Sequence, residues 1–167
     1  MKNNKWHGNR LVAICGVFIA LSMMLSYIES LIPVSAAVPG IKLGLANIVT
    51  IIALNKIGVI PTIIISAGRI ILSGILFSNP AVILYSLAGA AMSILVMVIF
   101  TRIKFFSVTG ISILGGIFHN LGQLIVACII MENFRIMYYF IVLFVVGAIS
   151  GAVIGLFASY LLKTLRI

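Results

Sequence analysis

Long apolar segments alternate with short polar turns along the whole chain. Apolar runs of about 20 residues let a helix cross the hydrocarbon core of a bilayer, whereas the strands of a membrane barrel alternate in polarity over about ten residues. The pattern predicts an all-α integral membrane protein, with residues 1–167 forming a single transmembrane domain. Six helices are expected, at residues 11–28, 41–54, 59–77, 81–100, 108–131 and 137–162. The second is short, which a tilted or partly buried helix tolerates.

Composition and charge support this interpretation and add an orientation. Of the 167 residues, 63% are hydrophobic and only 8% are charged, which leaves too little polar surface for a soluble domain. The net charge of +9 does not point to nucleic acid as a partner, because the basic residues cluster between the apolar segments. The positive-inside rule predicts cytoplasmic termini and a multi-pass protein of a prokaryotic cell membrane. Eight of the eleven basic residues then lie on the cytoplasmic side: Lys2, Lys5, Arg10, Lys56, Arg102, Lys104, Lys163 and Arg166.

Residues 38–50 combine loop signals with polar side chains at the start of the second apolar segment. Pro39-Gly40 ends any element that precedes it. Lys42 and Asn47 follow inside a run that is otherwise apolar, with Asn47 about 7–8 Å further along a helix. We expect this stretch to form the wall and the outer mouth of a small-molecule site.

Other polar side chains fall near the middle of the third and fifth segments. Arg69 lies where a charge costs roughly 2.5–3.5 kcal/mol. His119 and Gln123 are four residues apart and share a helix face, and Asn120 lies next to His119. A cation, a histidine and several amides at similar depths favour an anionic or strongly hydrogen-bonding ligand, such as a polar heteroaromatic molecule. The expected substrate-binding residues are Lys42, Asn47, Arg69, Tyr85, His119, Asn120 and Gln123.

A purely structural role is the competing interpretation for these polar groups. Asn47 and His119 are explained equally well by hydrogen bonds between helices. Arg69 favours a cavity, because the two acids of the chain, Glu29 and Glu132, are expected at the outer rim, which leaves no counter-charge at its depth. The absence of embedded carboxylates also argues against a proton or ion relay.

Catalytic and metal-dependent functions lack the residues that they require. The chain contains no GxxxxGK[ST] sequence for binding ATP phosphates, no HExxH, no GxSxG and no cluster of metal ligands. We therefore expect no catalytic residues, no metal, no cofactor and no enzyme activity.

Small residues recur at four-residue spacing and favour close approach of helices. Gly147, Gly151 and Gly155 are expected to pack within the bundle. For Gly16 and Ala20, on the first helix, contact with a partner subunit is as plausible as packing within the bundle.

The sequence PGIKLGLANIVT at residues 39–50 resembles the signature of the Gx transporter family, which also carries the label heptaprenyl diphosphate synthase component I. Arg69 with Ser73-Gly74, YSLAG at 85–89 and GIFHNLGQ at 116–123 match this family as well. The resemblance extends over about residues 10–160. The family is similar in size and layout to the substrate-binding S components of energy-coupling factor (ECF) transporters.

This resemblance implies an import mechanism. An S component binds a vitamin-like ligand from outside, docks on a membrane scaffold subunit driven by two cytoplasmic ATPases, and releases the ligand inside by toppling. An Ala-x-x-x-Ala motif on the first helix of such proteins contacts the scaffold. Gly16 and Ala20 occupy the matching positions here, with glycine in place of the first alanine.

The synthase label conflicts with the residues present. Prenyl diphosphate synthases hold Mg²⁺ and diphosphate with clustered aspartates, because hard cations need carboxylate oxygens. This chain has two acidic residues in all, both glutamates, and no aspartate. Two alternatives to an ECF substrate-binding subunit remain: a non-catalytic accessory subunit of a polyprenyl diphosphate synthase, and a stand-alone carrier.

Overall fold

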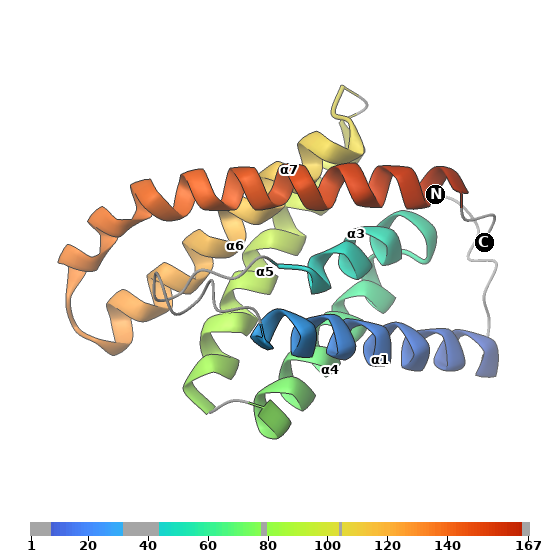
Figure 1. The fold of residues 1–167 in the computed structure, drawn as a ribbon, viewed down its shortest axis with the longest axis horizontal. Coiled ribbons are helices and arrows are strands. Elements are labelled where there is room, and N and C mark those ends of the chain that lie inside the picture. Colours follow the sequence, from blue (N-terminus) through green and yellow to red (C-terminus); the bar gives the residue numbers. More distant parts are fainter. Residues whose placement is uncertain (1–7, 32–43, 78–79, 104, 165–167) are drawn as a thin grey trace.

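Long helices make up almost all of the regular structure. The computed structural model describes residues 8–31, 44–77, 80–103 and 105–164. Five of its helices are long and apolar enough to cross a bilayer, and the chain is a multi-pass membrane protein, as predicted. Figure 1 shows the elements, which are α1 (Asn9–Leu31), α3 (Ala46–Lys56), α4 (Val59–Phe77), α5 (Pro80–Arg102), α6 (Val108–Ile130), η1 (Phe134–Tyr139) and α7 (Phe140–Thr164).

Most of the predicted boundaries hold to within three residues, and the second and sixth segments differ for local reasons. Helix α3 has 11 residues, so it rises only about 16 Å and is too short to cross a core of about 30 Å by itself. The sixth segment was expected to begin at residue 137. A 3₁₀ turn occupies Phe134–Tyr139 instead, and the side chain of Asn133 accepts a hydrogen bond from the Arg135 N–H at its start.

Helix α3 lies at the centre of the packing, between α1 and α4 on one side and the α5–α6–α7 layer on the other (Figure 1). Seven of its eleven residues are buried, so it has no solvent- or lipid-facing stripe of the usual width. Val49 and Ala53 pack with Ile65 of α4 and with the inner face of α1. Ile51 and Leu54 belong to a second cluster, which includes residues of α5, α6 and α7.

Glycines bring α6 close to both of its neighbours. A Cβ added to Gly151 of α7 would lie 2.7 Å from the Ser112 carbonyl oxygen, and one added to Gly122 of α6 would lie 2.6 Å from the Ala88 carbonyl oxygen on α5. Such contacts stabilise helix pairs in membranes, where no hydrophobic effect drives their association. The predicted packing role of the glycine stripe on the last helix is consistent with this geometry.

Basic residues lie at one end of alternating helices. Arg10 is in the first turn of α1, while Lys56, Arg102 and Lys163 are in the last turns of α3, α5 and α7. Helix α1 begins and α7 ends on the same side of the molecule (Figure 1). Cations in a last turn also interact favourably with the helix dipole. This placement fits the expected cytoplasmic side.

Helix α1 lies at the edge of the bundle and keeps most of its surface exposed. Ser22 is the one residue of this helix that is buried. Val12 and Val17 are 72% and 65% exposed. Gly16 and Ala20, which lie one helical turn apart, are exposed as well. This apolar surface suits contact with lipid tails or with another apolar helix.

Candidate functional site

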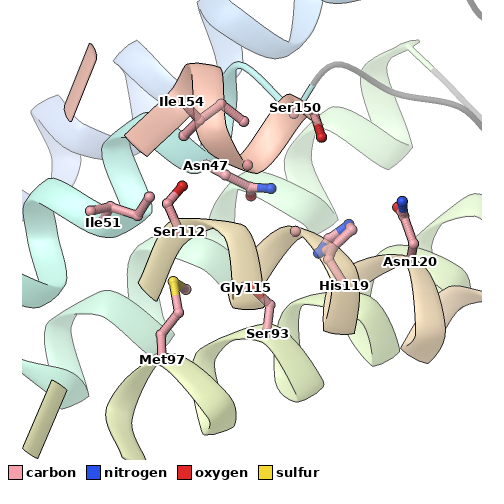
Figure 2. Close-up of a pocket in the computed structure, with 13 residues that line it drawn as sticks. Asn47, Ile51, Ser93, Met97, Ser112, Gly115, His119, Asn120, Ser150 and Ile154 are labelled. Carbon is pink, nitrogen blue, oxygen red and sulfur yellow. The ribbon is translucent and has the colours of Figure 1, made fainter. Parts of the chain in front are cut away.

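A small cavity opens where α3, α5, α6 and α7 meet. Its polar lining consists of Asn47, Ser93, Ser112, His119, Asn120 and Ser150. Glycines contribute backbone to the wall, and Ile51, Met97 and Ile154 close the apolar side. Figure 2 shows Asn47 of α3 placed between the ribbons of α6 and α7, with Ser112 and His119 rising toward the same space from α6.

The cavity is closed down in this structure. The volume of the cavity is about 20 Å³, and one ordered water needs roughly 10–15 Å³. It therefore holds about one water, and a larger ligand requires α3 to move away from α6 and α7.

Three of the seven predicted binding residues line this cavity: Asn47, His119 and Asn120. Asn120 also ties two helices together, because its Nδ2 donates a hydrogen bond of 2.8 Å to the Leu143 carbonyl oxygen on α7. Gly147 makes room for that amide, since an added Cβ would lie 2.8 Å from Asn120 Nδ2. Asn120 thus has a structural role in joining α6 to α7, and it lines the cavity as well.

The start of α3 depends on Gly44 and on a carboxylate from α1. Gly44 has φ +74°, a backbone conformation that residues with a Cβ rarely adopt. The side chain of Leu45 at the N-cap makes no capping hydrogen bond. The Glu29 carboxylate accepts hydrogen bonds from the N–H groups of Gly44 at 2.6 Å and Leu45 at 3.1 Å. A carboxylate at this position satisfies donors that no helix bond uses and interacts favourably with the dipole.

Glu29 was expected at the outer rim, and it lies in the last turn of α1, from which this contact connects it to the cavity wall. Glu29 is part-buried, and Gly44, to which it is bonded, lines the same cavity as His119 and Gly151. His119 and Gly151 both lie near the middle of their helices. Gly44 thus links the Glu29 carboxylate, at the end of α1, to the cavity wall.

Arg69 lies outside the cavity lining, beside α1. Its Nη1 donates a hydrogen bond of 3.2 Å to Ser26 Oγ, and its guanidinium interacts electrostatically with Glu29. The sequence led us to expect no acid acting on Arg69, and the structure shows that the charge of Glu29 does act on it. A charge inside a bilayer is costly, and the negative charge of Glu29 lowers that cost for Arg69.

The remaining predicted residues lie elsewhere. Gln123 packs on α5, where a Cβ added to Gly89 would lie 2.9 Å from its Cγ. Tyr85 is half-buried on α5, four residues before Gly89, and neither Tyr85 nor Gln123 is among the described residues that line the cavity. Lys42 lies outside the described residues.

Sequence reasoning missed the serines of the site. Ser93, Ser112 and Ser150 line the cavity, and the first two are 4% and 3% exposed. Serines are common at helix contacts in membranes, so none of the three is distinctive as a single residue. The one signal available was position, since Ser93 lies four residues after Gly89 and Ser150 next to Gly151.

The comparison with known families agrees with the sequence resemblance. The profile of a family described as Heptaprenyl diphosphate synthase component I matches residues 18–161, most of the chain. The chain belongs to this family. The family name describes one component of a synthase. The apolar helices show that this member of the family is a membrane protein. No curated protein and no solved structure matches the chain.

Proposed function

We propose that this chain is the substrate-binding membrane subunit of an ECF-type importer for a vitamin- or cofactor-like small molecule. The observation that carries the proposal is the cavity between α3, α5, α6 and α7. It gathers hydroxyl, amide and imidazole groups inside an otherwise apolar bundle, and polar groups converging on an enclosed space are typical of ligand sites.

The partners of such an importer follow from what the chain lacks and from what it exposes. The sequence has no phosphate-binding loop, so uptake against a gradient needs ATPases from other subunits. Gly16 and Ala20 lie on the exposed apolar surface of α1, where the backbone of another helix can approach closely. We propose that a membrane scaffold subunit docks there and connects this chain to two cytoplasmic ATPases.

Affinity purification from native membranes, followed by mass spectrometry of proteins and small molecules, tests this proposal. We expect a scaffold subunit, two ATPases and one retained small molecule. The double variant Asn47→Ala with His119→Ala should lose the small molecule and keep the protein partners. Purification of the wild-type chain with no ATPase subunit and no small molecule would count against the proposal.

A second candidate function rests on the name of the family. A non-catalytic membrane subunit of a polyprenyl diphosphate synthase is compatible with a chain that has no aspartate, because the catalytic carboxylates then belong to a soluble partner. The same purification would recover an aspartate-rich synthase in place of the ATPases. Transport by vesicles that contain this chain alone would instead indicate a stand-alone carrier.

A further inference from the structure

The polar lining of the cavity contains no permanently charged side chain among the described residues. Its hydrogen-bonding side chains are amides, hydroxyls and the imidazole of His119, and no Lys, Arg, Asp or Glu of the described chain is part of it. Within a low-dielectric bundle an ionised ligand needs a counter-charge or several charge-assisted hydrogen bonds. The lining described here offers donors and acceptors without that counter-charge.

Glu29 interacts with two positive features, one at the cavity wall and one outside the cavity lining. The first is the start of α3, where the N–H groups of Gly44 and Leu45 are the natural place for an anion. The Glu29 carboxylate already accepts hydrogen bonds from both of them. The second is Arg69, whose guanidinium interacts electrostatically with the same carboxylate. One acidic side chain thus occupies the N–H groups that would otherwise attract an anionic ligand, and its negative charge also acts on Arg69.

Ser112 is an independent sign that the cavity accepts a hydrogen-bonding group. Its side chain is 3% exposed, and its Oγ has no hydrogen-bond partner among the described residues. Figure 2 shows this oxygen directed from α6 toward Asn47 of α3. A buried hydroxyl left without a partner is destabilising, so a bound group that pairs with Ser112 is favoured.

We propose that the cavity binds the uncharged, hydrogen-bonding part of its ligand, and that Glu29 makes it selective against anions. This inference rests on the proposed function and specifies the substrate class of the same site. The ligand group presents a donor or acceptor to Ser112 and to Asn47, and it enters when the first turn of α3 moves away from α6. A phosphate or carboxylate on the same molecule, if there is one, lies outside this cavity.

Thiol labelling tests the proposal without knowledge of the ligand. Cys15 and Cys128 are replaced by alanine in the full chain, and Ser112→Cys places a thiol in the cavity. Two reagents of similar size are compared in detergent: neutral 2-hydroxyethyl methanethiosulfonate and anionic 2-sulfonatoethyl methanethiosulfonate. Rates at residue 112 are divided by those at Thr164→Cys, which is exposed at the end of α7.

We expect the neutral reagent to have the higher normalised rate at residue 112, by at least about tenfold, because of the cost of an unpaired charge inside the bundle. Glu29→Gln should reduce this preference severalfold, whereas Glu132→Gln, at an exposed turn, should leave it unchanged. Equal rates for the two reagents in the wild-type background would overturn the proposal, even if Glu29→Gln fails to fold. An unchanged preference in folded Glu29→Gln would overturn the role of Glu29.

The retained small molecule separates this inference from the proposed function. A molecule that is neutral at pH 7 and is lost in Ser112→Ala supports the inference. A molecule whose anionic group is required for retention, purified together with the ATPases, would contradict the inference and leave the importer function in place. If no ATPase is purified with the chain, the importer function is contradicted. The labelling preference for the neutral reagent would still support the neutral character of the cavity in that case.

Discussion

At the scale of single residues, Glu29 links the features that the sequence presents separately. Its carboxylate accepts hydrogen bonds at the start of α3 and interacts with Arg69 of α4. The sequence identified Arg69 as anomalous, because a cation inside an apolar segment is costly. It did not identify the influence of Glu29 on Arg69, because Glu29 precedes Arg69 by 40 residues and the two come within electrostatic range only when α1 packs against α4.

Gly44 permits a residue-scale prediction. Gly44→Ala should destabilise the protein by about 1–2 kcal/mol, because φ +74° places a Cβ in a left-handed conformation. The added Cβ would also lie 3.1 Å from Asn47 Nδ2 and 3.2 Å from Ile154 Cδ1, both at the cavity. Thermal unfolding in detergent measures the first effect, and retention of the copurified small molecule measures the second.

Gly58→Ala is the matched control for Gly44→Ala. Gly58 also has a positive φ, +119°, but a Cβ there meets nothing within 4 Å. It should lower stability and leave small-molecule retention intact. Equal loss of retention in the two variants would show that backbone strain, and not the wall of the cavity, explains the effect of Gly44→Ala.

At the scale of elements, α3 determines where the site forms. Its buried residues contact α1 and α4 on one side and the α5–α6–α7 layer on the other, so its first turn faces the cavity while its last turn ends at Lys56. A full-length span would have placed Asn47 near the surface. Because α3 is only 11 residues long, Asn47 lies at mid-level, beside His119.

The glycine contacts between α6 and α7 give a prediction at the same scale. Gly151→Ala should destabilise the protein by about 1–3 kcal/mol, because the added Cβ meets backbone atoms of α6 at 2.7 Å and the helices have to separate. Gly110→Ala, on α6, is the control, because a Cβ added there would have its nearest neighbour at 3.6 Å. Unfolding temperatures of the two variants in one detergent measure the difference, and equal temperatures would contradict the close packing of α6 and α7.

At the scale of the whole molecule, α1 has one face packed inside the bundle and one face exposed. Its inner face packs on α3 and α4, and Glu29 near its end reaches the cavity wall. Its other face, which includes Gly16 and Ala20, remains exposed. A partner bound to α1 would therefore contact the same helix that holds the entry of α3 in place.

The exposed face of α1 yields a prediction about partners. Gly16→Leu combined with Ala20→Leu should leave the fold and small-molecule retention unchanged, because a Cβ at Gly16 meets nothing within 4 Å. It should reduce recovery of the scaffold and ATPases by at least about tenfold, since two larger side chains prevent close approach of a helix. Ala81→Leu, at an exposed position of α5, is the control, and quantitative mass spectrometry is the measurement. Unchanged recovery in the double variant would exclude this face as the docking surface.

The sequence by itself determined the fold class, most helix boundaries and the membrane location. Those properties follow from local composition and from the length of apolar runs, because each run of sufficient length can form a membrane helix independently of the others. It also selected Asn47, His119 and Asn120, because polar groups inside apolar helices are rare enough to stand out.

Only the tertiary structure decided which of the polar residues share a site. It placed Ser93, Ser112 and Ser150 at the cavity, and it placed Arg69 outside the lining, hydrogen-bonded to Ser26 and within the electrostatic influence of Glu29. The physical reason is that these groupings depend on how α1, α3 and α6 are packed and rotated, which is set by contacts between residues far apart in the chain. The composition and spacing of residues within one segment do not specify its contacts with distant segments.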